Sequence, residues 1–207
     1  SYKRPYQVEE TDNANILLRA EVLNKILHAG ASIHARVIIT YPEALTEKVV
    51  TKANLSKNTL EIKQNEKLSV DFIVETLTTY HFKREDFVIE PGQFSVRGGI
   101  IDVFSFANDY PYRIELFGED VETIRTFDPV TQLSMQKISS ASVIPNIEDK
   151  LLIESRQSFL EYIPENTVIW INDFALAEEK IRKEFEVAEK NFAEQKEESI
   201  FNHLSPS

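Results

Sequence analysis

The sequence of 207 residues contains no cysteine, a single methionine, a single tryptophan and only five glycines. Without cysteine there can be no disulfide, zinc–thiolate site or cysteine nucleophile, and the chain suits a reducing cytoplasm. No apolar run approaches the roughly 20 residues that a membrane helix needs, and no signal peptide opens the chain. We therefore expect a cytoplasmic protein with no membrane partner.

Positive charge is also scarce, because 23 Lys and Arg stand against 34 Asp and Glu, a formal net charge of −11. Such a surface repels phosphate backbones, which disfavours nucleic-acid binding by the chain as a whole. The hydrophobic share of 42% and the charged share of 28% are typical of a globular protein. The length fits one or two domains.

The motifs of common catalytic sites are missing as well. No G-x-x-x-x-G-K-[ST] loop is present to hold a triphosphate, and no serine elbow motif is found. The histidines lack ligand spacing: His28, His34, His81 and His203. Four acidic residues could be imagined as a two-metal cluster: Asp102, Glu115, Glu119 and Asp120. Since Asp102 belongs to a different strand and Glu119-Asp120 reads as a hairpin turn, we predict no catalytic residue, no metal site and no cofactor.

The first flank has the pattern of an α/β layer. Apolar residues at helical spacing predict a helix from Ile16 to Leu27 that ends at Gly30. The apolar run 37–40 predicts a strand buried on both faces, and residues 43–50 read as a second helix. The polar stretch 51–58 reads as a linker.

The second flank repeats this pattern after a linker candidate at 145–150. The apolar run 167–171 predicts another buried strand, which could lie beside the strand at 37–40. Asn172 or Asp173 then caps a charged helix that extends to about residue 196. An apolar stripe follows one side of this helix: Ala177, Ile181, Phe185, Ala188 and Phe192.

Between the flanks, the pattern changes to short alternating runs behind one helix. Ser69 can cap a helix over residues 70–80, and turn residues separate the runs that follow. Strands are predicted at 87–90, 94–97, 100–104, 112–117, 121–127 and 141–144. The middle unit is therefore expected to be a small antiparallel sheet packed on a helix.

Strand alternation separates the two faces of this sheet. One face is apolar, and the other displays the following residues: Arg97, Arg113, Glu115, Phe117 and Arg125. Arginines with a carboxylate and an exposed aromatic ring are typical of an interface centre. The alternative interpretation is a solvated cross-strand ladder that stabilises only the sheet.

The stretch 90–104 reads E-P-G-Q-F-S-V-R-G-G-I-I-D-V-F, residues 113–120 read R-I-E-L-F-G-E-D, and residues 124–132 read I-R-T-F-D-P-V-T-Q. This long pattern resembles the UvrA-interacting domain that UvrB shares with transcription-repair coupling factors. The segments 40–45 and 163–167 look more like the coupling factor than UvrB.

The resemblance implies a fold class, a partner and a site. The fold is α/β: a small antiparallel α+β domain at 54–146, inserted between two pieces, 1–53 and 147–207, of a partial, degenerate helicase-like α/β domain. The partner is UvrA, which the module would recruit for transcription-coupled nucleotide excision repair. Contacts with RNA polymerase and DNA would belong to other domains of a longer ATP-dependent translocase, so this chain is not expected to be an enzyme.

By position, the resemblance assigns UvrA contacts to four residues: Arg84, Arg97, Arg113 and Glu115. Phe117 joins them because of its predicted face, and Ser95 stands where UvrB has a further arginine. Two alternatives stay open. The chain could be part of a UvrB-type DNA-damage ATPase without its nucleotide loop, or the arginine face could be an internal clamp that packs against another domain.

Overall fold

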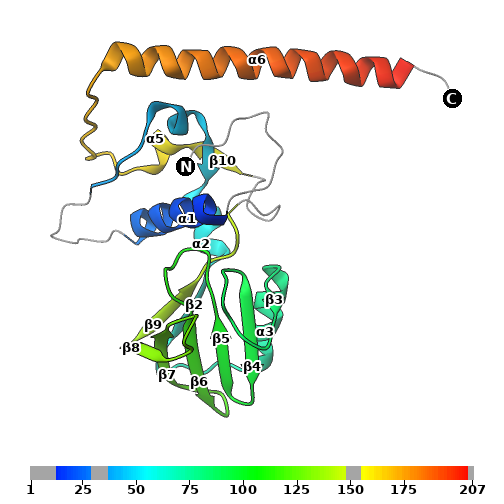
Figure 1. Cartoon of the computed structure of the whole chain (residues 1–207). Coiled ribbons are helices and arrows are strands. Elements are labelled where there is room, and N and C mark those ends of the chain that lie inside the picture. Colours follow the sequence, from blue (N-terminus) through cyan, green and yellow to red (C-terminus); the bar gives the residue numbers. More distant parts are fainter. Residues whose placement is uncertain (1–12, 29–36, 148–154, 205–207) are drawn as a thin grey trace. The chain divides into compact units, whose positions relative to one another are not determined.

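The computed structural model describes residues 13–28, 37–147 and 155–204 (Figure 1). The chain divides into two compact units: residues 12–31 with 50–155, and residues 1–11 with 32–49 and 156–207. The predicted domain limits at 53/54 and 146/147 stay predictions, because compactness alone does not show which segments fold independently. We refer to the two as the sheet unit and the flanking unit.

The sheet unit contains α1 and most of the strands. Its helices are α1 (Asn13–Leu27), α2 (Lys52–Lys57) and α3 (Val70–Thr79). Its strands are β2 (Leu60–Lys63), β3 (Lys83–Arg84), β4 (Gln93–Arg97), β5 (Ile100–Val103), β6 (Tyr112–Phe117), β7 (Asp120–Phe127), β8 (Ser134–Ile138) and β9 (Ser140–Val143). Strands β3 to β8 form one sheet in sequence order, antiparallel throughout except for the β3–β4 pair, and β2 pairs with β9.

The core lies on one face of the six-stranded sheet, where α3 packs (Figure 1). Ile73 and Leu77 of α3 are fully buried against strand residues such as Ile101 and Ile114, and the β2–β9 pair adds Ile62 to the same cluster. The predicted cap is confirmed, since the Ser69 hydroxyl accepts a hydrogen bond from the Phe72 amide at 3.1 Å. Because α3 and the core occupy one face of the sheet, the opposite face can make other contacts.

The β4–β5 hairpin turns on two glycines, as the sequence predicts. Gly98 has a φ of +60°, a conformation that glycine adopts without strain. A Cβ on Gly99 would lie 2.4 Å from the carbonyl oxygen of Leu116, so no other residue fits there. This tight turn sets the register that pairs Arg97 with Ile100 and Ser95 with Asp102.

The flanking unit contains the short helix η1 (Pro42–Thr46), α5 (Phe159–Tyr162), the long α6 (Phe174–Leu204), and the paired strands β1 (Lys48–Val50) and β10 (Arg156–Ser158). Asp173 caps α6, because its Oδ1 accepts a hydrogen bond from the Leu176 amide at 2.9 Å. Lys180 of α6 forms an ion pair with Glu43 of η1 at 2.9 Å, and this bond lowers the pKa of the Glu43 carboxyl. The predicted end of helix α1 at Gly30 lies outside the described residues.

Several predicted elements are wrong. Residues 37–40 and 167–171 are not strands, and their apolar side chains are largely exposed: 86% for Val37 and 92% for Trp170. The segment 43–50 is a short 3-10 helix followed by β1, the linker at 51–58 contains α2, and 87–90 is a loop. The reason is common to both apolar runs: a strand needs a neighbour for its backbone hydrogen bonds, and no described strand lies beside either run.

Candidate protein interface on the sheet

Two rows of side chains cross the face of the sheet opposite α3. The strand register defines them, since residues directly paired on neighbouring strands point to the same face. The longer row is Ser95, Asp102, Arg113, Arg125 and Lys137, and the row beside it is Arg97, Ile100, Glu115 and Thr123. Charged residues thus dominate a sheet face whose reverse side is apolar core.

A buried carboxylate lies at the centre of these rows. The side chain of Asp102 is fully buried, and its Oδ1 accepts a hydrogen bond from Arg113 Nε at 2.7 Å. Its Oδ2 accepts from Arg113 Nη2 at 2.8 Å and also from Arg97 Nη2. One carboxylate therefore holds two arginines, one of them in the bidentate geometry that makes such pairs strong.

The Arg113 side chain is held by contacts with Asp102, Phe127 and Gln132. Its side chain is 15% exposed, its guanidinium carbon lies 4.5 Å from the centre of the Phe127 ring, and its Nη1 donates to the Gln132 carbonyl at 3.3 Å. The hydrogen bond to Asp102 raises the pKa of Arg113, against a smaller opposing effect of burial. Arg113 is therefore a permanently charged part of the sheet rather than a mobile surface cation.

Arg97 is held more loosely and reaches solvent. Its side chain is 44% exposed, and its Nη1 donates to the Asp86 backbone carbonyl at 3.1 Å and to the buried Ser95 hydroxyl at 3.2 Å. These bonds and the one to Asp102 leave part of the guanidinium without a partner among the described residues. Arg97 can therefore bind an incoming acceptor without breaking its existing contacts.

A second charged network joins Glu115, Arg125 and Thr123. Glu115 Oε1 accepts a hydrogen bond from Arg125 Nη2, and its Oε2 accepts from the Thr123 hydroxyl at 2.7 Å. Both charged side chains are about three-quarters buried, with 29% of Glu115 and 25% of Arg125 exposed. The pair is electrically neutral, so the positive charges of this face that remain belong to Arg97, Arg113 and Lys137, against the carboxylate of Asp102.

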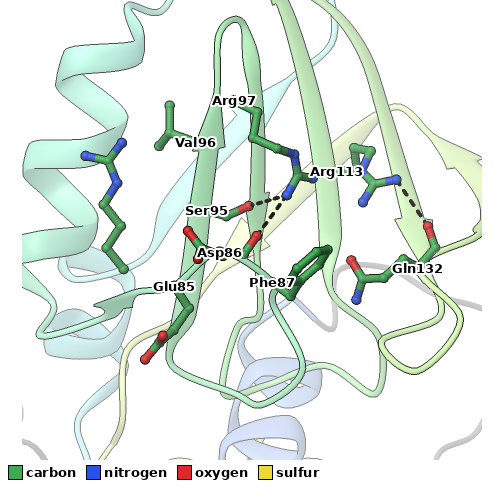
Figure 2. Close-up of a pocket in the computed structure, with 9 residues that line it drawn as sticks. Glu85, Asp86, Phe87, Ser95, Val96, Arg97, Arg113 and Gln132 are labelled. Carbon is green, nitrogen blue, oxygen red and sulfur yellow. Dashed lines mark hydrogen bonds between the residues drawn. The ribbon is translucent and has the colours of Figure 1, made fainter.

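An open hollow of about 850 Å³ lies beside the two arginines, at the loop that joins β3 to β4. Its lining consists of Arg84, Glu85, Asp86, Phe87, Ser95, Val96, Arg97, Arg113 and Gln132. Figure 2 shows the side chains of Arg97 and Arg113 next to one another, with the Phe87 ring below them. Phe87 is 64% exposed, so the hollow combines cationic and aromatic surface.

A tight turn between β7 and β8 supports one side of the hollow. Gln132, which has a φ of +61°, donates from Nε2 to the Pro129 carbonyl at 2.8 Å and to the Val88 carbonyl at 3.2 Å. In the same turn Asp128 accepts bonds from Thr131, and these lower the pKa of the Asp128 carboxyl. The turn thereby fixes the Gln132 carbonyl that receives Arg113.

The predicted site residues are not all equivalent in the structure. Arg97 and Arg113 come together around Asp102, and Arg84 is exposed and lines the same hollow. Glu115 lies next to them but is paired with Arg125. Phe117 is 76% exposed at the end of β6, outside the lining of the hollow.

Three parts of the site were not predicted from the sequence. Asp102 was considered only as a metal ligand, although the two-residue Gly98-Gly99 turn already places it diagonally across from Arg97. Phe87 was predicted to lie in a strand at 87–90, but it lies in a loop and is exposed. The contribution of Gln132 depends on a positive-φ turn that no short pattern signals.

Among the residues that the structure describes, no group of three or more acidic or histidine side chains is placed to hold a metal ion. Asp102 itself is surrounded by guanidinium groups, which would repel a cation. No helix within the described ranges combines the length and the apolarity that crossing a bilayer requires.

The fold of the sheet unit is that of a small α+β domain. Residues 60–148, just under half of the chain, match the UvrB interaction domain family. The resemblance predicted from the sequence is confirmed.

The relatives extend the similarity beyond this segment. The chain is 27% identical to a transcription-repair-coupling factor of Bacillus subtilis over 86% of its own length and 14% of that protein. The corresponding factor of Myxococcus xanthus is 29% identical over 73% of this chain and 12% of its own. The UvrABC system protein B of Nitrosomonas europaea is 38% identical over 42% of this chain and 13% of its own. The chain thus spans only a small fraction of the length of these relatives.

Proposed function

We propose that the chain is a non-catalytic docking module that binds UvrA through the arginine face of its sheet, and so recruits UvrA for transcription-coupled nucleotide excision repair. The observation that carries the proposal is the Arg97–Asp102–Arg113 cluster, which lies inside the segment that matches the UvrB interaction domain. A cluster of arginines that is partly open to solvent has the chemistry of an interface centre.

Charge supports this proposal. The chain as a whole carries a net charge of −11, yet this face concentrates two guanidinium groups around one carboxylate. An isolated patch of excess positive charge on an acidic protein favours an acidic surface of a partner protein. Extended nucleic acid fits less well, because the acidic remainder of the chain would repel its phosphates.

The flanks favour a coupling factor over UvrB as the parent protein. Similarity to the Bacillus subtilis coupling factor covers 86% of the chain, whereas similarity to the UvrABC system protein B covers 42%. In this proposal the module acts in the cytoplasm, and contacts with RNA polymerase and DNA belong to parts of the parent protein outside this chain.

The experiment is a calorimetric titration of the chain into purified UvrA. We expect binding with micromolar or tighter affinity, and we expect Arg97→Ala to weaken it by about 2–5 kcal/mol, the range for truncating one partner of a buried interfacial charge pair. Arg97→Glu should abolish binding and leave the chain folded, because Arg97 is a partly exposed residue at a hairpin end.

Arg182→Ala is the matched control, since Arg182 is an exposed arginine of α6 in the flanking unit. It should bind UvrA with wild-type affinity. A folded wild-type chain that gives no binding heat with UvrA would refute the proposed function. Equal affinity for the wild type and Arg97→Glu would keep the partner but reject this face.

A further inference from the structure

The carboxylate of Asp102, at the centre of the face, cannot touch a partner because its side chain is fully buried. Asp102 nevertheless makes all the charge-assisted contacts that hold the two arginines together. Burial of an aspartate is rare without such pairing, so its position on the docking face calls for an explanation in terms of the arginines.

We propose that Asp102 is the positioning residue of the docking face: it holds Arg97 and Arg113 as one preordered pair whose remaining positive charge receives a single carboxylate of the partner. This inference rests on the proposed function. It assigns to a buried residue the orientation of the groups that touch UvrA.

The first observation is the position of the two guanidinium groups around Asp102. Both arginines donate to the same oxygen, Oδ2 of Asp102, so their guanidinium groups lie beside one another although like charges repel. In the absence of a partner, the shared carboxylate offsets that repulsion. Without Asp102, the repulsion would favour moving Arg97, the more exposed of the two, away into solvent.

The second observation is the net charge of the Arg97–Asp102–Arg113 cluster. One carboxylate against two guanidinium groups leaves an excess of one positive charge within the Arg97–Asp102–Arg113 cluster. The hollow beside this cluster is also lined by Arg84, Glu85 and Asp86. Asp86 also lines the hollow, but it contacts Arg97 through its backbone carbonyl rather than its carboxylate. The complement of this site is therefore one aspartate or glutamate side chain of the partner, held by forked N–H donors.

The third observation is that both arginine side chains are already ordered in the free chain. Ordering a long side chain at an interface opposes binding, and a side chain that is already ordered in the free protein avoids this cost. In the free chain both groups are ordered by their bonds to Asp102. Arg97 adds a bond to Ser95 and Arg113 a bond to the Gln132 carbonyl (Figure 2), and Arg113 also contacts the Phe127 ring. Loss of Asp102 should therefore weaken docking through the arginines even if the sheet stays folded.

The test is a double-mutant cycle with UvrA binding as the readout. It compares the wild type, Asp102→Asn, Arg97→Ala and the double variant, with Asp71→Asn as the control for loss of an exposed carboxylate on α3, on the far side of the sheet. Asp102→Asn should weaken binding roughly tenfold, as expected when long side chains must be ordered on binding. Its effect should be clearly smaller in the Arg97→Ala background, and Asp71→Asn should bind as the wild type.

A merely structural role gives a different result. Asp102→Asn would then reduce affinity by the same factor in both backgrounds, in proportion to the fraction of unfolded chain seen by circular dichroism, and the inference would be overturned. Wild-type affinity for Asp102→Asn would overturn it too. A wild-type chain that does not bind UvrA would instead refute the proposed function.

A measurement on the wild-type chain covers the case in which Asp102→Asn does not fold. Nitrogen-15 spectra of arginine side chains should show the Arg113 Nε–H bond ordered and protected from exchange with water, because it donates to buried Oδ1. Arg182, exposed on α6, serves as the mobile reference. An Arg113 signal as mobile as that of Arg182 would refute the preordered pair.

Discussion

At the scale of single residues, the two central arginines divide the work of the docking face. Arg113 is mostly buried, stacks on Phe127 and binds Asp102 with two bonds, so truncating it leaves a buried carboxylate with less compensation. Arg97 is exposed enough to be removed with little strain. Loss of binding in an Arg97 variant therefore reports on docking, whereas an Arg113 variant reports on docking and stability together.

Phe87 is the residue for which the structure adds a contact that the sequence did not suggest. Its ring is 64% exposed on the wall of the hollow, next to the arginines. Exposed aromatic residues beside arginines are typical of interface centres. We predict that Phe87→Ala weakens binding to UvrA by about 1–2 kcal/mol, measured by calorimetry, while its melting temperature stays near that of the wild type.

Phe72 provides the matched control for this substitution, since it is 48% exposed on α3, away from the docking face. Phe72→Ala should leave the affinity for UvrA unchanged. If both phenylalanine variants lost affinity equally, the effect would be a general one on the fold. If neither lost affinity, Phe87 would lie outside the contact.

At the scale of elements, the docking face depends on a helix that never touches the partner in our proposal. The α3 helix supplies Ile73 and Leu77 to the core behind the sheet, and it begins at the Ser69 cap. We predict that Ser69→Ala lowers the free energy of unfolding by about 1 kcal/mol, because the Phe72 amide loses its acceptor. Urea titration followed by circular dichroism measures this change.

The same variant separates stability from docking. Folded Ser69→Ala should bind UvrA with wild-type affinity, since the cap lies behind the sheet. Ser56→Ala, at an exposed position in α2, is the control and should cost no stability, because alanine is the better helix former. An unfolding curve of Ser69→Ala identical to the wild type would contradict the assigned cap.

The residue pattern of the sequence was enough to predict four strands of the sheet and one hairpin. Period-two alternation located β4, β5, β6 and β7, and the Gly98-Gly99 pair located the hairpin that brings Arg97 close to Asp102. Strand β8 was missed because its residues Ser134–Ile138 are almost all exposed, so they show no apolar alternation. Phe87 was misplaced because an apolar residue in a loop looks like one in a strand when only the pattern is read.

At the scale of the whole molecule, the segments before and after the sheet unit are joined by a pair of strands that the sequence did not predict. The prediction placed 37–40 beside 167–171, whereas the structure pairs β1 with β10, from the ends of the two flanks nearest the sheet unit. Both apolar runs were read correctly as hydrophobic and wrongly as buried. Burial depends on neighbouring chain, which a local pattern does not contain.

The single tryptophan, Trp170, allows the exposure of the run 167–171 to be tested. Trp170 is 92% exposed in the run 167–171, so its fluorescence should resemble that of indole in water. We predict an emission maximum that hardly moves when urea unfolds the chain, and quenching by acrylamide nearly as efficient as for a free tryptophan derivative. A dilution series checks for a second copy covering the ring, which would make quenching depend on protein concentration. A blue-shifted, quencher-resistant emission at all concentrations would contradict the exposed position, because it would mean that other parts of the same chain bury this apolar run.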